Sequence, residues 1–192
     1  MTSASGRYEI VFNGEVYNFA ALRRELELEG QSFRGTSDTE VILAAVESWG
    51  MVQAIRRFVG MFAIALWDNA RKRRVLARDR TGVRPMYYTR ARGTLWFASE
   101  PKALFAAVPE RAALSAQGLL QTFSYWAPLD PDTVYEGVHS LPPGHVLAVE
   151  ADGRETLTRY WDWTFPDAAD TRPDRFGSLD AAVAELRERL ID

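Results

Sequence analysis

The residues with the clearest chemical potential follow a β-rich segment near the N-terminus: Asn13, Gly14 and Glu15. A strand that ends in Asn-Gly can present a side-chain amide N–H and a free backbone N–H in the same direction. Two such donors make an oxyanion hole, which stabilises charge developing on a carbonyl oxygen, and glycine permits the close approach of a ligand. The same dipeptide is also the commonest type I′ hairpin turn. Glu15 follows directly and could face either solvent or a ligand.

Asp38 is a second candidate, because it stands in the first turn of a predicted helix. The helix dipole stabilises a carboxylate at this position, and that carboxylate could receive the ammonium group of an amino-acid ligand. Ser37 and Glu40 form a Ser-x-x-Glu capping box. Capping is therefore the simpler explanation of Asp38 when the residue is considered alone.

Charged residues also crowd one short loop around Gly82, namely Arg78, Asp79, Arg80 and Arg84. We interpret them as an ion-pair network rather than as catalytic groups, because arginines in such settings usually position loops.

The sequence contains no cysteine and only two histidines, His139 and His145. It therefore has no disulfides, no thiolate metal sites and no cysteine nucleophile. A His-rich metal site is excluded too, and a Ser-His-Asp triad would have to use one of these two residues. Both lie in a Pro/Gly-rich region, where we expect structural roles. We predict no metal site.

The composition fits a folded domain of ordinary size. Of the 192 residues, 47% are hydrophobic, which supports a sizeable core. The net charge of −3 favours neither nucleic acid nor an anionic membrane. No apolar stretch reaches the roughly 18 residues that a membrane span requires, and the first residues do not resemble a secretory signal. We expect a cytoplasmic protein.

Helix and strand patterns alternate along most of the chain. Helices are predicted from Asn18 to Gly30, from Ser37 to Gly50, and near residues 101–107 and 115–123. The basic run at residues 71–74 reads as a solvated hairpin turn. The predicted strands occupy residues 7–12, 60–67, 74–78, 85–88, 95–98, 146–149 and 155–160.

The last 30 residues differ in character from the rest. Residues 163–178 are polar and carry Pro and Gly, which indicates a linker. Residues 179–192 form an amphipathic helix with Val183, Leu186 and Leu190 on one face. Such a face must be buried against something, so this helix looks like the first element of a further domain.

Taken in order, these features resemble one family, the class II glutamine amidotransferase domain of glutamine-hydrolysing asparagine synthetases. The resemblance covers residues 7–162 and continues into the terminal helix. The sequence blocks nearest the C-terminus, together with the helix that follows them, separate this family from other class II amidotransferases. Its seven blocks are residues 13–18, 36–41, 60–68, 77–88, 97–100, 141–145 and 159–162.

The resemblance implies an α+β fold of the N-terminal nucleophile hydrolase type, a four-layer αββα sandwich. In such an enzyme an N-terminal cysteine attacks the side-chain amide of glutamine, with its own α-amino group as base. Ammonia then passes through a tunnel to an ATP-binding synthetase domain, where it meets β-aspartyl-AMP. ATP and Mg²⁺ are the cofactors of that second domain, and none is implied for this one.

The family's functional residues can be placed on matching positions. The Asn13 side chain and the Gly14 backbone N–H match the oxyanion hole, Glu15 matches a glutamine-binding position, and Asp38 matches the carboxylate that grips the substrate's ammonium group. The loop that holds Arg78, Asp79, Arg80 and Arg84, together with the segment that ends at Glu100, resembles parts that lie toward the tunnel and the domain interface.

The sequence also departs from the family. The cysteine, the opening strands and a carboxylate-binding arginine have no counterpart, and neither does the Ser-Gly-Gly-x-Asp-Ser loop of the ATP site. Thr2, on a short leader, would lie far from the geometry that a nucleophile needs. We therefore expect a sandwich without its opening strands, and exposed strand edges that lead to self-association, as a homodimer or larger.

Two functions remain open. The chain is either the glutamine-hydrolysing part of an asparagine synthetase-type enzyme, inactive by itself, or a non-catalytic structural module, as in β-lactam synthetase-like relatives. A related enzyme with another acceptor would carry the same amidotransferase part. Glutamine and an ATP-binding synthetase domain are the expected partners.

Overall fold

The computed structural model describes residues 1–165 and 176–191 and divides the chain into two units, Met1–Asp162 and Trp163–Asp192. The predicted linker at residues 163–178 lies largely outside the described residues. In the second unit, helix α6 (Leu179–Ile191) forms where the amphipathic pattern predicts it.

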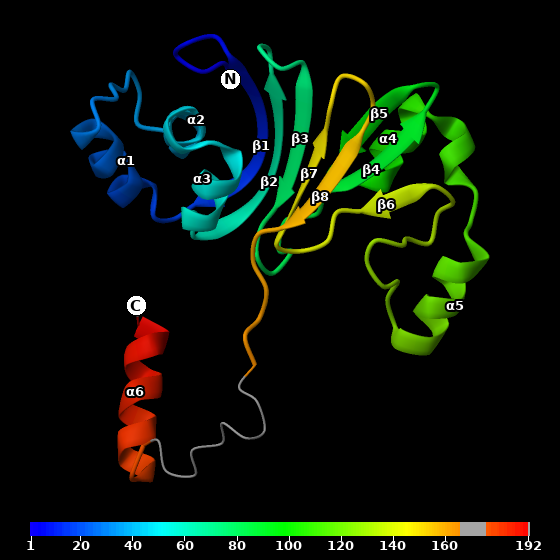
Figure 1. Cartoon of the computed structure of the whole chain (residues 1–192). Coiled ribbons are helices and arrows are strands. Elements are labelled where there is room, and N and C mark those ends of the chain that lie inside the picture. Colours follow the sequence, from blue (N-terminus) through cyan, green and yellow to red (C-terminus); the bar gives the residue numbers. More distant parts are fainter. Residues whose placement is uncertain (166–175, 192) are drawn as a thin grey trace. The chain divides into compact units, whose positions relative to one another are not determined.

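The first unit is a sandwich of four layers, helix–sheet–sheet–helix (Figure 1). Three helices cover one face of a five-stranded antiparallel sheet: α1 (Phe19–Leu28), α2 (Asp38–Trp49) and α3 (Met51–Arg57). The strands of that sheet, in spatial order, are β1 (Tyr8–Val16), β2 (Gly60–Asp68), β3 (Arg73–Arg78), β7 (His145–Val149) and β8 (Glu155–Arg159).

A second sheet packs against the other face of the first, and its strands, in spatial order, are β5 (Thr94–Ala98), β4 (Tyr87–Ala91) and β6 (Val138–Ser140). The outer helical layer contains α4 (Pro101–Ala107), the short 3₁₀ helix η1 (Pro109–Ala112) and α5 (Ala116–Tyr125). This arrangement confirms the α+β sandwich that the sequence predicts.

Two apolar cores hold the layers together, and β2 contributes to both. Phe62 and Ile64 point into the core between the helices and the first sheet, whereas Ala63 and Ala65 point into the core between the two sheets. A central strand that is covered on both faces reads as a continuous apolar run. The strand predicted at residues 60–67 is therefore confirmed, and it is covered on both faces.

Three hairpins join neighbouring strands, and the predicted turn at residues 71–74 forms one of them. The basic turn joins β2 to β3, Arg92-Gly93 joins β4 to β5, and Asp152-Gly153 joins β7 to β8. Three elements were missed, and one of them is the four-residue 3₁₀ helix η1. Helix α3 follows Gly50 with almost no break, and β6 has three residues, too few to show alternation.

The prediction that a strand ends at Asn13-Gly14 is wrong, because β1 continues through both residues to Val16. Asn13 pairs with Ala63 and Gly14 pairs with Phe62 in the antiparallel register with β2. The hairpin-turn interpretation of this dipeptide is therefore excluded. Gly14 serves a contact between strands instead of a turn.

The two predicted helix caps have different outcomes. The Ser37 hydroxyl accepts from the Glu40 backbone N–H, as the capping box requires, while the Glu40 carboxylate accepts from the N–H groups of Arg34 and Gly35. Hydrogen bonding from the Arg34 backbone lowers the pKa of Glu40. Asn18 makes no side-chain cap. Its amide instead donates to the Arg57 carbonyl and accepts from the N–H of residue 59.

Candidate functional site

The site is built on the outer edge of β1, the first strand in its sheet. Residues 1–3 cover only the half of this edge that lies near the start of β1. The Ser3 N–H donates to the Tyr8 carbonyl at 2.8 Å, and the Ile10 N–H donates to the Met1 carbonyl at 2.9 Å. Even-numbered residues of β1 therefore direct their backbone groups away from β2, as alternation in an antiparallel ladder requires.

Asp38 occupies the far end of the same edge. The Val16 N–H donates to Asp38 Oδ2 at 3.0 Å, so the first turn of α2 closes over the end of β1. Gly14 belongs to the same even-numbered set as Val16, and its N–H faces the open stretch of edge that lies between Ile10 and Asp38. Asp38 is half-buried, and its second oxygen, Oδ1, receives one long hydrogen bond from Thr39 at 3.4 Å.

The spacing along this edge suits an amino acid with an amide side chain. A strand rises about 3.4 Å per residue, so the N–H groups of Gly14 and Val16 lie about 7 Å apart. Asp38 sits at the Val16 end. An extended glutamine has its ammonium and its amide oxygen separated by a comparable length, with one hydrogen bond needed at each end.

Gly14 cannot carry a side chain. Its φ is +147°, and an added Cβ would lie 2.0 Å from the Met61 carbonyl oxygen. Gly60, two pairs further along the ladder from Phe62, faces a similar contact, since its Cβ would lie 2.1 Å from the Glu15 carbonyl oxygen. The close approach of β1 and β2 at this point therefore depends on both glycines.

Asn13 points to the opposite face of β1 from Ile10, toward the second sheet. Its Nδ2 donates to the Ser99 hydroxyl at 3.0 Å, which links β1 to the residue that follows β5. An amide NH₂ group has two hydrogens, so one donor remains for a ligand at the edge. Sequence reasoning missed Ser99, although residues 97–100 form one of the blocks on which the resemblance rests.

Glu15 lies on the same face of β1 as Asn13 and is exposed. It is paired in register with Met61. Within the part of the chain that the structure describes, no hydrogen bond or ion pair engages its carboxylate, so it is available to a ligand at this end of the edge.

Arg78 and Asp79 form a structural clamp instead of the expected ion-pair network. The Arg78 guanidinium donates to the carbonyls of Gly82, Arg84 and Leu141 at 2.8–2.9 Å and to the Ser140 hydroxyl at 3.1 Å. The guanidinium of Arg78 is therefore engaged mainly by backbone carbonyls. It positions the loop, as the sequence predicted, but through hydrogen bonds to these carbonyls and not through ion pairs.

Asp79 is fully buried and accepts four backbone N–H groups, those of Phe62, Thr81, Val83 and Arg84. The Tyr160 hydroxyl closes the cluster by donating to the Arg78 carbonyl at 2.8 Å. Burial, and then the nearby Asp79 carboxylate, raises the pKa of Tyr160 above its ordinary value.

The other charged candidates have different partners or surroundings. The Arg80 side chain donates to the Arg56 carbonyl at 3.0 Å, and Arg84 is half-buried. Glu100 is exposed, precedes α4 and pairs with Lys102. The structure thus brings Asn13, Gly14 and Asp38 to one strand edge, and Glu100 directly follows Ser99, the hydrogen-bond partner of Asn13.

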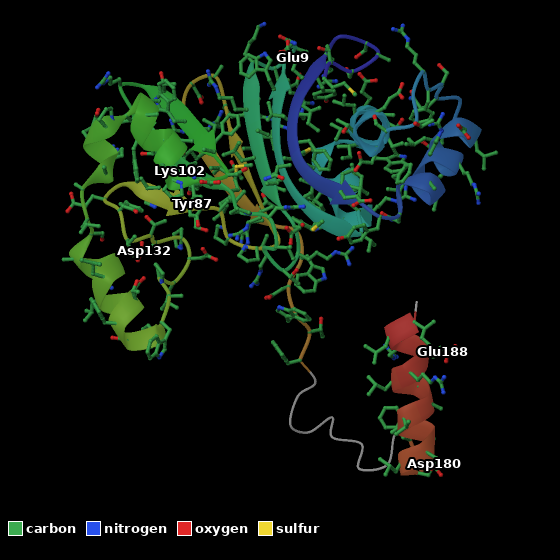
Figure 2. All side chains as sticks on the ribbon, turned by 180° about the vertical axis from the view of Figure 1, so that it is seen from behind. Glu9, Tyr87, Lys102, Asp132, Asp180 and Glu188 are labelled. Carbon is green, nitrogen blue, oxygen red and sulfur yellow. The ribbon has the colours of Figure 1, made fainter. Side chains whose placement is uncertain are left out.

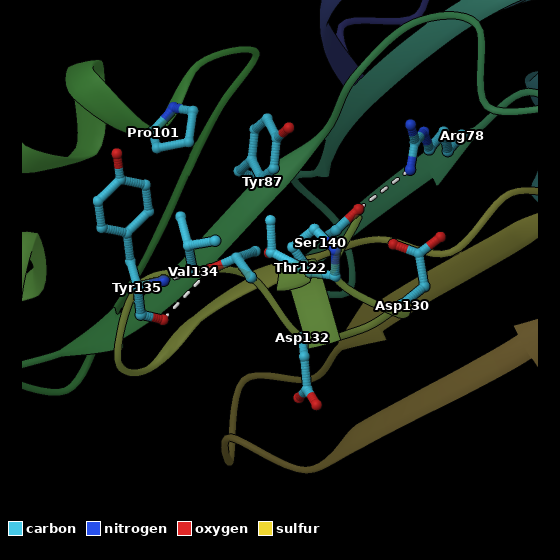
Figure 3. Close-up of a pocket in the computed structure, with 11 residues that line it drawn as sticks. Arg78, Tyr87, Pro101, Thr122, Asp130, Asp132, Val134, Tyr135 and Ser140 are labelled. Atoms are coloured by element: carbon cyan, nitrogen blue, oxygen red, sulfur yellow. Dashed lines mark hydrogen bonds between the residues drawn. The ribbon is translucent and has the colours of Figure 1, made fainter. Parts of the chain in front are cut away.

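An open pocket lies beside the clamp, between the second sheet and the loop after α5 (Figure 3). Its lining includes Arg78, Tyr87, Asp130, Asp132 and Tyr135. Because four of the five N–H donors of Arg78 already hold backbone or hydroxyl groups, this pocket offers a ligand little cationic recognition.

The two histidines have packing roles. His145 Nδ1 lies 2.7 Å from the Pro143 carbonyl, and the His139 ring lies 5.5 Å from the ring of Tyr88. Over residues 1–165 and 176–191, no group of three or more His, Asp or Glu side chains could hold a metal ion. Within those same ranges, no helix is long and apolar enough to cross a membrane.

The four-layer sandwich, with the Asn13 amide and the Gly14 N–H at one open strand edge, can be compared with known protein families. Residues 1–161 match the family model described as "Glutamine amidotransferase domain". The chain belongs to this family.

Individual relatives agree with this assignment. The chain is 35% identical over 186 residues to asparagine synthetase [glutamine-hydrolyzing] 3 of Bacillus subtilis, which covers 96% of this chain but 29% of that protein. It is 34% identical over 186 residues to the amidase chyE of Penicillium rubens, covering 95% and 26%. The chain thus spans less than a third of these relatives.

Among solved structures, the fold resembles glutamine phosphoribosylpyrophosphate amidotransferase from B. subtilis. The TM-score is 0.61 at 21% identity, and the match covers 84% of this chain and 31% of that one. This likeness supports the N-terminal nucleophile hydrolase fold.

Proposed function

We propose that this chain is the glutamine-binding part of an asparagine synthetase-type amidotransferase, which supplies ammonia from glutamine for an ATP-dependent amidation. The observation that carries the proposal is the open edge of β1. It presents the Gly14 N–H and the Asn13 amide near one end of a glutamine-sized span and the Asp38 carboxylate at the other.

In this proposal each residue has a separate task. Asp38 Oδ1 accepts from the substrate ammonium group, and Glu15 contacts the substrate from the exposed face. The Gly14 N–H and the Asn13 amide stabilise the oxyanion that forms when a nucleophile adds to the glutamine side-chain carbonyl. A single donor of this kind contributes a factor of about 10² to 10³ in rate.

The nucleophile is not among these 192 residues, which include no cysteine. Thr2 does not replace it, because Thr2 pairs with Glu9 at the far end of β1 (Figures 1 and 2). Five residues of strand, about 17 Å, separate Glu9 from Gly14. The chain alone is therefore proposed to grip glutamine without hydrolysing it.

Further parts of the proposal concern the rest of the protein. The relatives are more than three times as long as this chain. The proposed partner is an ATP-binding synthetase domain that uses Mg²⁺ and amidates aspartate. Helix α6 would be its first element, because Leu179, Val183, Leu186 and Leu190 expose an apolar stripe. The arginine-rich loop and Glu100 would lie toward the tunnel and this domain. We propose a cytoplasmic location.

A second candidate function rests on the missing cysteine. A synthetase-supporting module without glutaminase activity would keep the sandwich and need no nucleophile. The genomic sequence on either side distinguishes the two. A start that encodes an N-terminal cysteine upstream and a Ser-Gly-Gly-x-Asp-Ser segment downstream support the amidotransferase, and intact unrelated genes on both sides support the free-standing module.

A glutaminase assay on the purified chain tests the proposal that it is inactive alone. Glutamate release from glutamine is expected to stay at the level of a no-protein blank, because the chain has no cysteine and Thr2 pairs at the other end of β1. The matched variant is Asn13→Ala, which removes one oxyanion donor. Release above the blank in the wild type that Asn13→Ala abolishes would show that the chain does turn glutamine over.

A further inference from the structure

Helix α5 is attached to the sandwich by its small and polar residues. Gly118 is buried, and an added Cβ would lie 2.0 Å from the Thr133 carbonyl oxygen. The buried Gln121 amide donates to Asp132 Oδ2 and accepts from the Leu129 N–H, both at 2.9 Å. These contacts fix which face of the helix points inward.

Most of the large apolar residues of α5 consequently face outward, while Leu119 is half-buried. Residues 113–129 contain no charged residue, in a chain in which 26% of residues are charged. We call the exposed side chains of this segment the α5 apolar face: Leu120 (61% exposed), Phe123 (85%), Tyr125 (64%), Trp126 (94%) and Leu129 (51%).

This orientation is the reverse of an ordinary surface helix, which buries its apolar stripe and exposes its polar one. The α5 apolar face offers about 600 Å² of surface, since an aromatic side chain alone can bury 150–250 Å². That is the upper end for a monomer's largest apolar patch. It also approaches the roughly 800 Å² per partner of a standard interface.

We propose that the α5 apolar face is a dimer interface that binds the same face of a second copy of this chain. The face carries no charge, so a two-fold arrangement brings no like charges together. Two-fold pairs are the commonest assemblies and require a self-complementary patch. The projecting Phe123 and Trp126, three residues apart, can each pack beside the partner's copy of the other. Aromatic residues of this kind dominate interface energetics.

The interface does not use the edge of β1, where the proposed glutamine site lies. Residues 1–3 and Asp38 already occupy part of the β1 edge, and α5 lies on the other side of the sandwich (Figure 1). Dimerisation through α5 therefore leaves the proposed glutamine site accessible, and the two proposals can fail independently.

Sedimentation equilibrium of the full chain and of Phe123→Ser and Trp126→Ser variants tests the interface. At about 100 μM, well above the micromolar Kd of a modest interface, the wild type is expected to have the mass of two chains. Each substitution should raise the dimer Kd by about 30-fold or more. Both side chains are exposed, so the thermal midpoint of each diluted variant should match that of the wild-type monomer.

Two control variants locate the interface. Leu28→Ser alters an equally exposed residue (91%) at the end of α1, and Val11→Ser alters one (65%) on the β1 edge. Neither should change the dimer Kd. A wild-type chain that stays monomeric at about 100 μM overturns the proposal. The α5 apolar face would then bind a different protein or none. A dimer that Val11→Ser dissociates and the α5 variants leave intact also overturns the proposal.

Discussion

Replacing Asp79 with alanine is expected to lower the free energy of unfolding of the first unit by about 4 kcal/mol. The carboxylate is fully buried and accepts backbone N–H groups from Phe62, Thr81, Val83 and Arg84. Hydrogen bonds to a charged group contribute roughly 1.5–3 kcal/mol each, and a buried donor without an acceptor costs a further 1–3 kcal/mol. Partial entry of water keeps the total well below the sum.

Urea denaturation followed by circular dichroism measures this loss. The matched control is Asp152→Ala, which removes a surface carboxylate. This carboxylate also caps a turn, accepting from the Arg154 N–H at 3.0 Å, and it pairs with the Arg154 guanidinium. We expect the control to cost less than about 1 kcal/mol. Equal small effects of the two substitutions would mean that Asp79 does not organise its loop.

Replacing Gly14 with alanine is expected to cost about 3–5 kcal/mol and to remove the glutamine site at the same time. The methyl group would lie 2.0 Å from the Met61 carbonyl oxygen and 2.7 Å from Phe62 Cα, so β1 and β2 must separate. Overpacking of this kind costs about 1–3 kcal/mol, and a φ of +147° adds a strain of about 1–3 kcal/mol for a residue with a side chain.

Two other glycines separate these causes. Gly30 has a φ of +93° but open space around it, so Gly30→Ala reports the strain alone. Gly60 has a Cβ contact of 2.1 Å without a positive φ, so Gly60→Ala reports the contact alone. In thermal melts, Gly14→Ala should be more destabilising than either. A Gly14→Ala protein as stable as Gly30→Ala would contradict the close approach of the two strands.

Most of the fold follows from local patterns, and the exceptions share a physical cause. Strand β2 and the three hairpins are encoded by apolar runs and turn residues that act within a few positions. Asn18 and Gly14 could not be assigned locally, because Asn18 ties α3 to β2 and Gly14 serves a contact with Met61. Both functions depend on residues more than 35 positions away.

The candidate site was partly accessible from sequence. The oxyanion donors and Asp38 were proposed from residue chemistry and from the resemblance, and the structure adds their common position along one strand edge. Ser99 was missed, because nothing local relates it to Asn13. The Arg78 and Asp79 bonds were misjudged as ion pairs, since a sequence does not reveal that backbone groups of the same loop are the partners.

The most direct test of the account is a titration of the ¹⁵N-labelled chain with L-glutamine, followed by amide resonances. The account predicts that glutamine shifts the backbone resonances of Gly14 and Val16 and the side-chain NH₂ resonance of Asn13. Asp38→Asn should weaken this binding at least about 10-fold, a loss of about 1.4 kcal/mol. Glutaramate, which keeps the amide and the carboxylate of glutamine but lacks the ammonium group, should bind the wild type and Asp38→Asn equally weakly. Shifts confined to other regions, or binding that Asp38→Asn leaves unchanged, would contradict a glutamine site at the edge of β1.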